Sequence, residues 1–200
     1  MRILQACDCI VQARPDAIRV ATMGAMNTLD RLGVGQPRVS SVPLMGGAPS
    51  LALGLALAHP EQTVVVLDGD ASLLMQLGGL VSVAGQGPRN FYHFVMHNGT
   101  QFTGLSNLPI AGPRPVDFCQ LAEGAGYRRV FAIHDLDTLQ DRLPEIFAAE
   151  GPVMVELMLA PEPASFSAEN PQQDLTDRQF TRMGDEALQL RAWLAQRAQA

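Results

Sequence analysis

The sequence predicts a three-layer αβα fold with a central, mostly parallel β-sheet. Short apolar runs that suit strands alternate with segments whose apolar residues recur at helical spacing, and this alternation is typical of a parallel sheet covered by helices. The run Val64–Leu67 is entirely apolar and mostly β-branched, as expected for a central strand that is buried on both faces. A length of 200 residues suits one domain with a sizeable core.

The N-terminal part is expected to alternate helix and strand up to this central run. Residues 1–13 place their apolar side chains on one helical face and are followed by Pro15, so a helix is expected there. Strands are expected at residues 18–22 and 39–42, each followed by a glycine-containing turn and a helix. The second of these helices is rich in small residues, which allow close approach to the sheet.

The chemistry of the chain changes abruptly after Val64–Leu67. Asp68-Gly69-Asp70 follows at once, and from Ser72 to Val81 the apolar residues recur at helical spacing, which predicts a strand, a tight turn and one helix. A helix N-terminus favours phosphate, and a carboxylate at a strand end can hold a divalent cation. By itself, the same turn also fits a solvated turn with a helix cap.

A second polar turn follows the next expected strand. Phe91–Met96 suits a strand and leads into Asn98-Gly99-Thr100. Residues 72–97 suffice for one crossover helix and a return strand. Because open parallel sheets bind ligands at the carboxyl ends of their strands, we expect Asp70 and Asn98 to lie side by side.

The two polar turns together resemble a known motif. Gly69-Asp70-Ala71-Ser72, followed after residues 72–97 by Asn98, is similar to the G-D-G…N motif of thiamine diphosphate-dependent enzymes. Ala71 stands where that family usually has glycine, which requires an ordinary backbone conformation at this position. Residues 43–70 resemble the C-terminal, diphosphate-binding domain of phosphonopyruvate and sulfopyruvate decarboxylases, and the resemblance spans roughly residues 15–160.

This resemblance implies the thiamine diphosphate-binding fold and roles for individual residues. Asp70, the side chain of Asn98 and the carbonyl of Thr100 would ligate Mg²⁺. Met45 would lie beneath the bent cofactor, and the carbonyl of Pro43 would accept a hydrogen bond from its aminopyrimidine; without the resemblance, a methionine in an apolar loop is core filling by default. The expected cofactor-binding residues are Thr22, Met23, Gly24, Pro43, Met45, Gly69, Asp70, Ala71, Ser72, Asn98, Thr100, Gln101 and Phe102.

The C-terminal half is expected to complete the sheet and to end in a tail. Residues 101–106 form a polar loop that could close over the site. Helices are expected from residues 115–118 and at 135–148, and strands at 127–133 and 153–159. Residues 161–185 are rich in polar residues and proline, which predicts an extended or poorly ordered segment before a short amphipathic helix. We therefore expect a cofactor-binding domain over residues 1–160 and a polar tail over 161–200, whose helix docks on the body or, preferably, on another subunit.

Composition excludes several classes of function. The net charge of −6 argues against nucleic acid and anionic membranes as partners. No apolar run is long enough for a membrane span and the N-terminus is a poor signal peptide, so a cytoplasmic protein is expected. Cys7, Cys9 and Cys119 suggest no disulfide, and no second pair of ligands completes a metal site at Cys7-Asp8-Cys9.

The resemblance implies a carboxy-lyase that acts on a 2-oxo acid with thiamine diphosphate and Mg²⁺. In that family the activating glutamate belongs to a separate pyrimidine-binding domain, for which 200 residues leave no room. We therefore expect a β-type subunit of a hetero-oligomer, such as α₂β₂ or larger, with its active sites at the contact with an α-type subunit. The expected substrate is a small 2-oxo acid with an anionic 3-substituent, although Arg114 is the only cation in the expected loops.

Three alternatives remain at this point. The chain could be a non-catalytic, cofactor-binding or regulatory subunit. It could also belong to another thiamine diphosphate lyase or synthase, similar to benzoylformate decarboxylase or acetolactate synthase. A plain nucleotide-binding α/β module is disfavoured, because the sequence has neither G-x-G-x-x-G nor G-K-[ST].

Overall fold

The computed structural model describes residues 1–102, 107–110, 116–163 and 176–197. Six strands form one parallel sheet in the order β2-β1-β3-β4-β8-β7. Their bounds are β1 Ile18–Ala21, β2 Arg38–Ser40, β3 Val64–Gly69, β4 Phe91–His97, β7 Arg129–Ile133 and β8 Val153–Met158. A separate antiparallel pair consists of β5 (Thr100–Phe102) and β6 (Asn107–Pro109). The expected parallel central sheet is confirmed.

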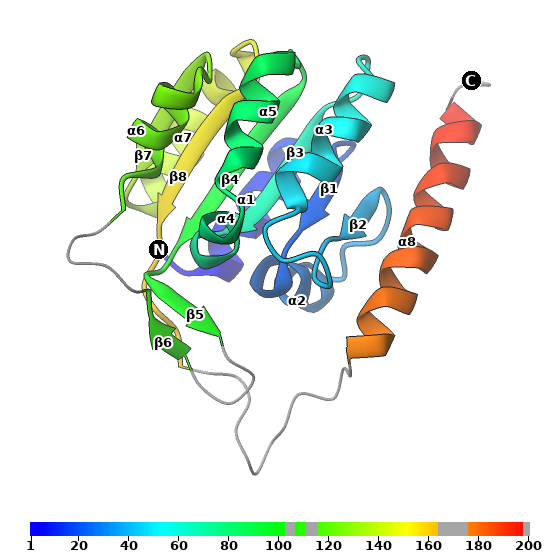
Figure 1. The fold of residues 1–200 in the computed structure, drawn as a ribbon, viewed down its shortest axis with the longest axis horizontal. Helices are drawn as coiled ribbons and strands as arrows, with labels where there is room; N and C mark the ends of the chain where they lie inside the picture. Colours follow the sequence, from blue (N-terminus) through cyan, green and yellow to red (C-terminus); the bar gives the residue numbers. More distant parts are fainter. Residues whose placement is uncertain (103–106, 111–115, 164–175, 198–200) are drawn as a thin grey trace.

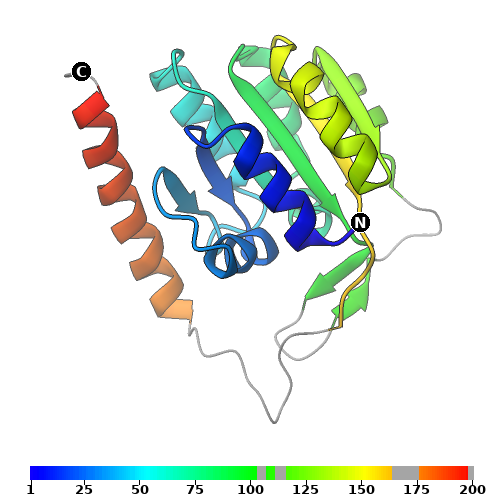
Figure 2. The same cartoon turned by 180° about the vertical axis from the view of Figure 1, so that it is seen from behind.

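Helices cover both faces of the sheet (Figures 1 and 2). One face carries α1 (Ile3–Ala13), α2 (Met23–Arg31) and α7 (Leu136–Ala148), whose apolar side chains share one core cluster. The other face carries α3 (Ala48–Ala58), α4 (Asp70–Met75), α5 (Gly78–Gln86) and α6 (Phe118–Ala125). The αβα prediction is therefore confirmed. None of the helices in the described ranges has the length and hydrophobicity that a membrane span needs.

Strand β3 shows why the central run is apolar throughout. Val65 and Leu67 face the core on the α1 side, whereas Val64 and Val66 face the core on the α3 side. Successive side chains of a strand point to opposite faces, so both faces need apolar residues. The same alternation turns Asp68 toward the α3 side, and the strand then ends at the carboxyl edge of the sheet.

The single helix expected from Ser72 to Val81 is in fact two helices, and this expectation was wrong. Helix α4 ends at Met75, because Gln76 has a non-helical backbone with φ −146° and ψ 58°. Helix α5 then begins at Gly78. The two glycines at its start are weak helix formers, and the periodicity of the leucines does not reveal this break. Val81, the last apolar residue of the recurring pattern, is exposed.

The C-terminal helix is longer than expected. It was expected only after Asp185, but α8 spans Thr176–Arg197. Arg182 donates to both carboxylate oxygens of Asp30, at 2.9 and 2.7 Å, and Ser40 donates its N–H to Glu186 Oε2 at 2.6 Å. These pairs dock α8 along the edge strand β2, which is why a strongly polar segment is helical. The domain boundary near residue 160 stays a prediction.

Candidate active site

A cavity of about 480 Å³ opens where β1, β3 and β4 end. Thr22, Asp70 and Asn98, which follow these three strands, all line it. Helices α2 and α4 begin at its wall. The first N–H groups of a helix have no partner within the helix, so two helix N-termini supply donors and positive dipole ends that suit an anion such as a diphosphate.

Asp70 connects the ends of two neighbouring strands. Its Oδ1 accepts the N–H of Ala71 and its Oδ2 accepts the N–H of Gly99, each at 2.7 Å. The residue is only 2% exposed. Burial raises the pKa of this carboxyl, and the hydrogen bonds from Gly99 and Ala71 and the nearby His97 offset that effect only in part. Because its hydrogen bonds come from backbone groups, a bound cation would stabilise the buried charge.

The turn after β4 holds the Asn98 side chain in place. Asn98 Oδ1 accepts hydrogen bonds from the N–H and from the hydroxyl of Thr100, both at 2.9 Å. Gly99 has φ +70°, a left-handed conformation that glycine adopts readily. This conformation directs the N–H of Gly99 to Asp70, so the two polar turns are bonded to each other.

The loop before α3 forms another part of the wall. Gly46 donates its N–H to the hydroxyl of Ser72 at 3.1 Å, which ties this loop to α4. Gly46 has φ +80°, and a Cβ there would lie 2.9 Å from the Cβ of Gln76. Glycine is therefore required at this position. The neighbouring Met45 lines the cavity with its side chain partly exposed.

Most of the residues expected from sequence lie on this cavity. Pro43 lies in the loop before α3 and is not one of the residues that line the described cavity. Phe102 belongs to β5, but its side chain is outside what the structure describes, as are residues 103–106 of the expected lid. Ala71 has the ordinary helical backbone that its side chain requires. The expected residues that line the cavity are Thr22, Met23, Gly24, Met45, Gly69, Asp70, Ala71, Ser72, Asn98, Thr100 and Gln101.

Comparison with known families shows which family the chain belongs to. Residues 36–157, which include both Asp70 and Asn98, match the family described as "Thiamine pyrophosphate enzyme, C-terminal TPP binding domain". The chain belongs to this family. The TPP-binding domain thus includes the polar turns after β3 and β4, whereas α2 and its cavity residues precede the matched segment.

Two curated relatives and one solved structure give the extent of the similarity. Phosphonopyruvate decarboxylase of Streptomyces viridochromogenes is 39% identical over 120 residues, which are 60% of this chain and 30% of that protein. Sulfopyruvate decarboxylase subunit beta of Methanothermobacter thermautotrophicus is 38% identical over 117 residues, 58% of this chain and 59% of that subunit. The chain therefore spans less than two thirds of either relative. A thiamin diphosphate-dependent enzyme from Mycobacterium smegmatis shares the fold, with a TM-score of 0.66 over 80% of this chain and 32% of that one, at 21% identity.

The cavity is lined by residues that the sequence analysis missed. Asn27 and Arg31 lie on the cavity wall together with Met23 and Gly24. Met23, Asn27 and Arg31 are each four residues apart, so they share one face of α2. That spacing could have identified Asn27 and Arg31 once the start of α2 was assigned to the site.

A buried polar network lies behind the Gly69-Asp70 turn. The His93 ring lies 3.3 Å from Asp68 Oδ2 through Nε2 and 3.3 Å from the Tyr127 hydroxyl through Nδ1. Asp68 Oδ1 also accepts the N–H of Gly69 at 2.9 Å. A carboxylate only accepts, so Nε2 of His93 donates to Asp68; in the neutral ring, Nδ1 then accepts from the Tyr127 hydroxyl. Burial, together with the charge of Asp68, raises the pKa of Tyr127 and keeps its hydroxyl a donor.

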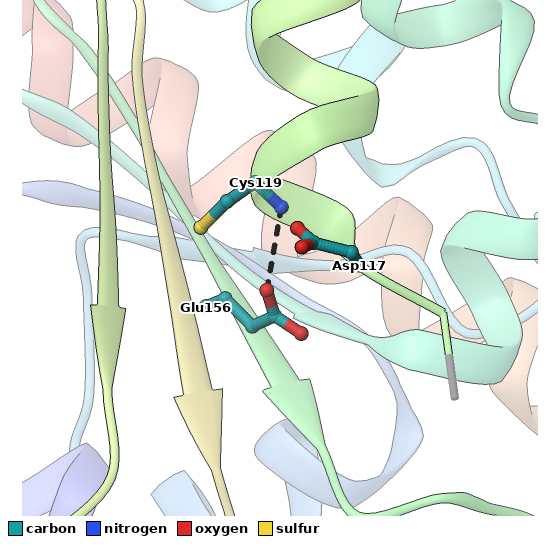
Figure 3. Close-up of side chains that lie close together, drawn as sticks. All are labelled: Asp117, Cys119 and Glu156. Carbon is teal, nitrogen blue, oxygen red and sulfur yellow. Dashed lines mark hydrogen bonds between the residues drawn. The ribbon is translucent and has the colours of Figure 1, made fainter. Parts of the chain in front are cut away.

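A second polar cluster joins β8 to the start of α6 (Figure 3). The carboxylate oxygens of Asp117 and Glu156 and the sulfur of Cys119, which are atoms that could bind a metal ion, lie within 4.8 Å of one another. Glu156 accepts a bond from the N–H of Cys119 at 3.3 Å and pairs with His97 Nδ1 at 2.6 Å, while Asp117 caps α6 through the N–H of Gln120. Burial and then Glu156 raise the pKa of the Cys119 thiol to about 12. The thiol therefore stays protonated, and the cluster fixes α6 against the sheet.

Proposed function

We propose that this chain is the β-type subunit of a thiamine diphosphate- and Mg²⁺-dependent 2-oxo acid decarboxylase. The observation that carries the proposal is the bond between the Asp70 carboxylate and the N–H of Gly99. It joins the two polar turns of the motif at a cavity where two helices begin. Membership of the family supports thiamine diphosphate as the cofactor.

The residues of the cavity fit a magnesium diphosphate. The N-termini of α2 and α4 would bind the phosphate oxygens, and Asp70, Asn98 and the carbonyl of Thr100 would hold the metal. Asn98 Oδ1 already accepts two hydrogen bonds from Thr100, and an amide oxygen has two lone pairs. Coordination therefore requires the Thr100 hydroxyl to rotate away from Asn98.

Other residues of this chain would orient the rest of the cofactor and the substrate. Met45 lies on the cavity wall, where an unbranched apolar side chain can support a bent cofactor, and we assign the carbonyl of Pro43 to its aminopyrimidine. When bound, thiamine diphosphate supplies the electron sink for the departure of CO₂ from a 2-oxo acid. Arg31 on the same wall offers a positive charge to an anionic substituent of the substrate.

The names of the relatives support the substrate class and the partner. The curated proteins at 38–39% identity are a phosphonopyruvate decarboxylase and a sulfopyruvate decarboxylase subunit beta. We propose accordingly a substrate with a sulfonate or phosphonate group. We also propose an α-type subunit that supplies the pyrimidine-binding half and the activating glutamate, in an assembly such as α₂β₂.

Calorimetry and turnover test this proposal together. The purified complex should bind thiamine diphosphate with Mg²⁺ and lose that affinity in EDTA, with no comparable binding of NAD or ATP. Sulfopyruvate and phosphonopyruvate should be decarboxylated faster than benzoylformate, and the isolated chain should be inactive. Activity of the isolated chain would contradict the shared active site. Mg²⁺-dependent binding without turnover would instead identify a non-catalytic subunit.

A further inference from the structure

The cavity is lined by more acidic than basic side chains. Among the described residues that line it, Asp30, Asp70 and Glu162 are acidic and Arg31 is basic. Three carboxylates against one guanidinium repel an anionic group such as a sulfonate or a phosphonate. An anionic substrate therefore requires that positive charge from outside the cavity compensates some of these carboxylates.

The three carboxylates differ in how they are compensated. Asp70 is the residue assigned to the metal ion, which would neutralise it. Glu162 is exposed, so water and salt screen its charge. Asp30 is the chain neighbour of Arg31 in the last turn of α2, where the helix dipole is also negative. The charge of Asp30 therefore decides whether this end of the cavity attracts an anion.

Helix α8 supplies the positive charge that compensates Asp30. Arg182 donates to both of its carboxylate oxygens, at 2.9 and 2.7 Å, and such bidentate pairs are among the stronger ion pairs. Burial raises the pKa of Asp30, but the hydrogen bonds from Arg182 and Arg38 outweigh burial and lower it. Asp30 is thus ionised at neutral pH. Arg38 compensates it only in part, because Arg38 also pairs with Glu186 at 3.4 Å.

Arg31 stays available for a ligand while Asp30 is held by α8. Arg31 is exposed and makes no ion pair with any residue that the structure describes. Asn27, one turn earlier on α2, lines the same wall and offers an amide donor. A guanidinium and an amide together suit the oxygens of a sulfonate or phosphonate group.

We propose that Arg182 of α8 is a specificity-determining residue that compensates Asp30 and thereby leaves Arg31 free to bind the anionic substituent of the substrate. The inference rests on the proposed function and concerns the same cavity. Asp30, Arg31 and Arg182 all lie outside residues 36–157, which match the TPP-binding family. Helix α8 runs along β2 at the edge of the sheet (Figure 1). It therefore adds a preference for charge to a cofactor-binding domain of which it is not part.

Two variants that break the same ion pair from opposite sides separate charge from structure. Arg182→Gln and Asp30→Asn both weaken the contact of α8 with α2, but the first leaves a negative charge on the cavity and the second removes it. Arg182→Lys keeps the charge without the bidentate geometry. Arg191→Gln, at an exposed position of α8, is the matched control for net charge.

The probe is methanesulfonate, and uncharged dimethyl sulfone is its control. NMR titration of the full-length chain, followed at the side-chain amide of Asn27, gives the dissociation constant. Arg182→Gln should weaken methanesulfonate binding by about fivefold, the effect of one partly exposed charge, and Arg31→Gln should abolish it. Asp30→Asn should bind at least as tightly as the parent, and adding Asp30→Asn to Arg182→Gln should restore the lost affinity.

The control variants should leave methanesulfonate binding almost unchanged. Arg182→Lys and Arg191→Gln should stay within about twofold of the parent, and no variant should alter the response to dimethyl sulfone. Equal losses in Arg182→Gln and Asp30→Asn would show that α8 acts through structure alone and would overturn the proposal. Unchanged affinity in both variants would overturn it as well.

Kinetics of the complex distinguish this proposal from the proposed function. Arg182→Gln should lower kcat/KM for sulfopyruvate more than for pyruvate, which lacks the sulfonate, and Asp30→Asn should not. Equal effects on both substrates would contradict a role in specificity. Charge-dependent methanesulfonate binding by a chain whose complex decarboxylates neither acid would support the role of Arg182 and overturn only the proposed function.

Discussion

The carboxylate of Asp70 accepts the backbone N–H of Gly99 at 2.7 Å, although the two residues are 29 positions apart. The register of β3 and β4 accounts for this contact, since Gly69 is paired with Met96 at the ends of the two strands. The bond makes the two polar turns one rigid unit at the edge of the sheet. A ligand that contacts one of these turns therefore also lies next to the other turn.

Replacing Asp70 by Asn should abolish tight binding of magnesium thiamine diphosphate. The amide keeps the size of the side chain but removes the charge, and loss of a direct metal ligand should cost at least about 100-fold in affinity, the upper end of what outer-shell partners cost. Calorimetry on the complex measures this effect. Asp141→Asn is the control, because Asp141 is exposed on α7. Equal affinities of both variants for magnesium thiamine diphosphate would contradict the assignment of Asp70 as a metal ligand.

Gly46→Ala should disturb the cavity wall. Its Cβ would lie 2.9 Å from Gln76 Cβ and 3.1 Å from Ser72 O, in a left-handed conformation, so we expect a loss of about 1–3 kcal/mol in the free energy of unfolding. Gly124→Ala in α6 is the matched control, since its Cβ would meet nothing within 4 Å. That variant should be at least as stable as the parent in urea unfolding. Equal stability of both variants would show that the loop can adapt.

Tyr127→Phe should destabilise the protein through the buried network behind the site. It leaves His93 Nδ1 without its donor, and an unsatisfied buried group costs about 1–3 kcal/mol. Urea unfolding of Tyr127→Phe, Asp68→Asn and the double variant gives their coupling energy. Strictly additive effects would contradict a connected network.

The docking of α8 should depend on pH through Asp30. Burial opposes its charge, but the hydrogen bonds from Arg182 and Arg38 outweigh burial and lower the pKa of this carboxyl. Because the pKa of Asp30 is lower in the folded protein than in the unfolded chain, its carboxylate stabilises the folded protein at pH values above the ordinary aspartate pKa of about 4. This stabilisation is lost as the pH falls through the lowered pKa. Asp30→Asn should therefore be less stable than the parent at pH 7, and the difference should shrink on acidification below pH 4.

Fluorescence of Trp193 measures this dependence directly. It is the single tryptophan of the chain and lies on α8, packed against the core. Urea unfolding followed at this residue, at pH 7 and at about pH 3, compares the two proteins. A stability difference that is constant over this range would show that the Asp30 carboxylate contributes no pH-dependent stabilisation.

The three cysteines should differ in reactivity. Burial raises the pKa of Cys7 to about 12, and burial with Glu156 raises that of Cys119 to about 12. Since the thiolate is the reactive form, iodoacetamide at pH 7.5 should modify the partly exposed Cys9 first. Peptide mass spectrometry identifies the modified residue. Rapid alkylation of Cys119 would indicate a thiolate, which could bind a metal together with Asp117 and Glu156.

The sequence predicted the sheet and the meeting of its polar turns because both depend on local patterns. Four apolar residues before Asp68 specify a buried strand, and the length of residues 72–97 permits one crossover. The break at Gln76 escaped prediction because it depends on how α4 fits beneath the loop at Gly46. A C-terminal helix was expected after Asp185, but the first part of α8 escaped prediction, because Arg182 looks like a solvated charge until Asp30 is placed beside it. Arg31 was missed for a similar reason, since its position on the cavity depends on the direction of α2.

The contact of α8 with β2 has a consequence for how this chain behaves at high concentration. The N–H groups of Arg38 and Ser40 are bonded to side chains, Gln36 Oε1 at 2.9 Å and Glu186 Oε2 at 2.6 Å. Neither donor is then available to a strand from another molecule, which weakens this edge as a template for intermolecular β-pairing. Helix α8 thus protects this edge of the sheet against pairing with a strand from another molecule.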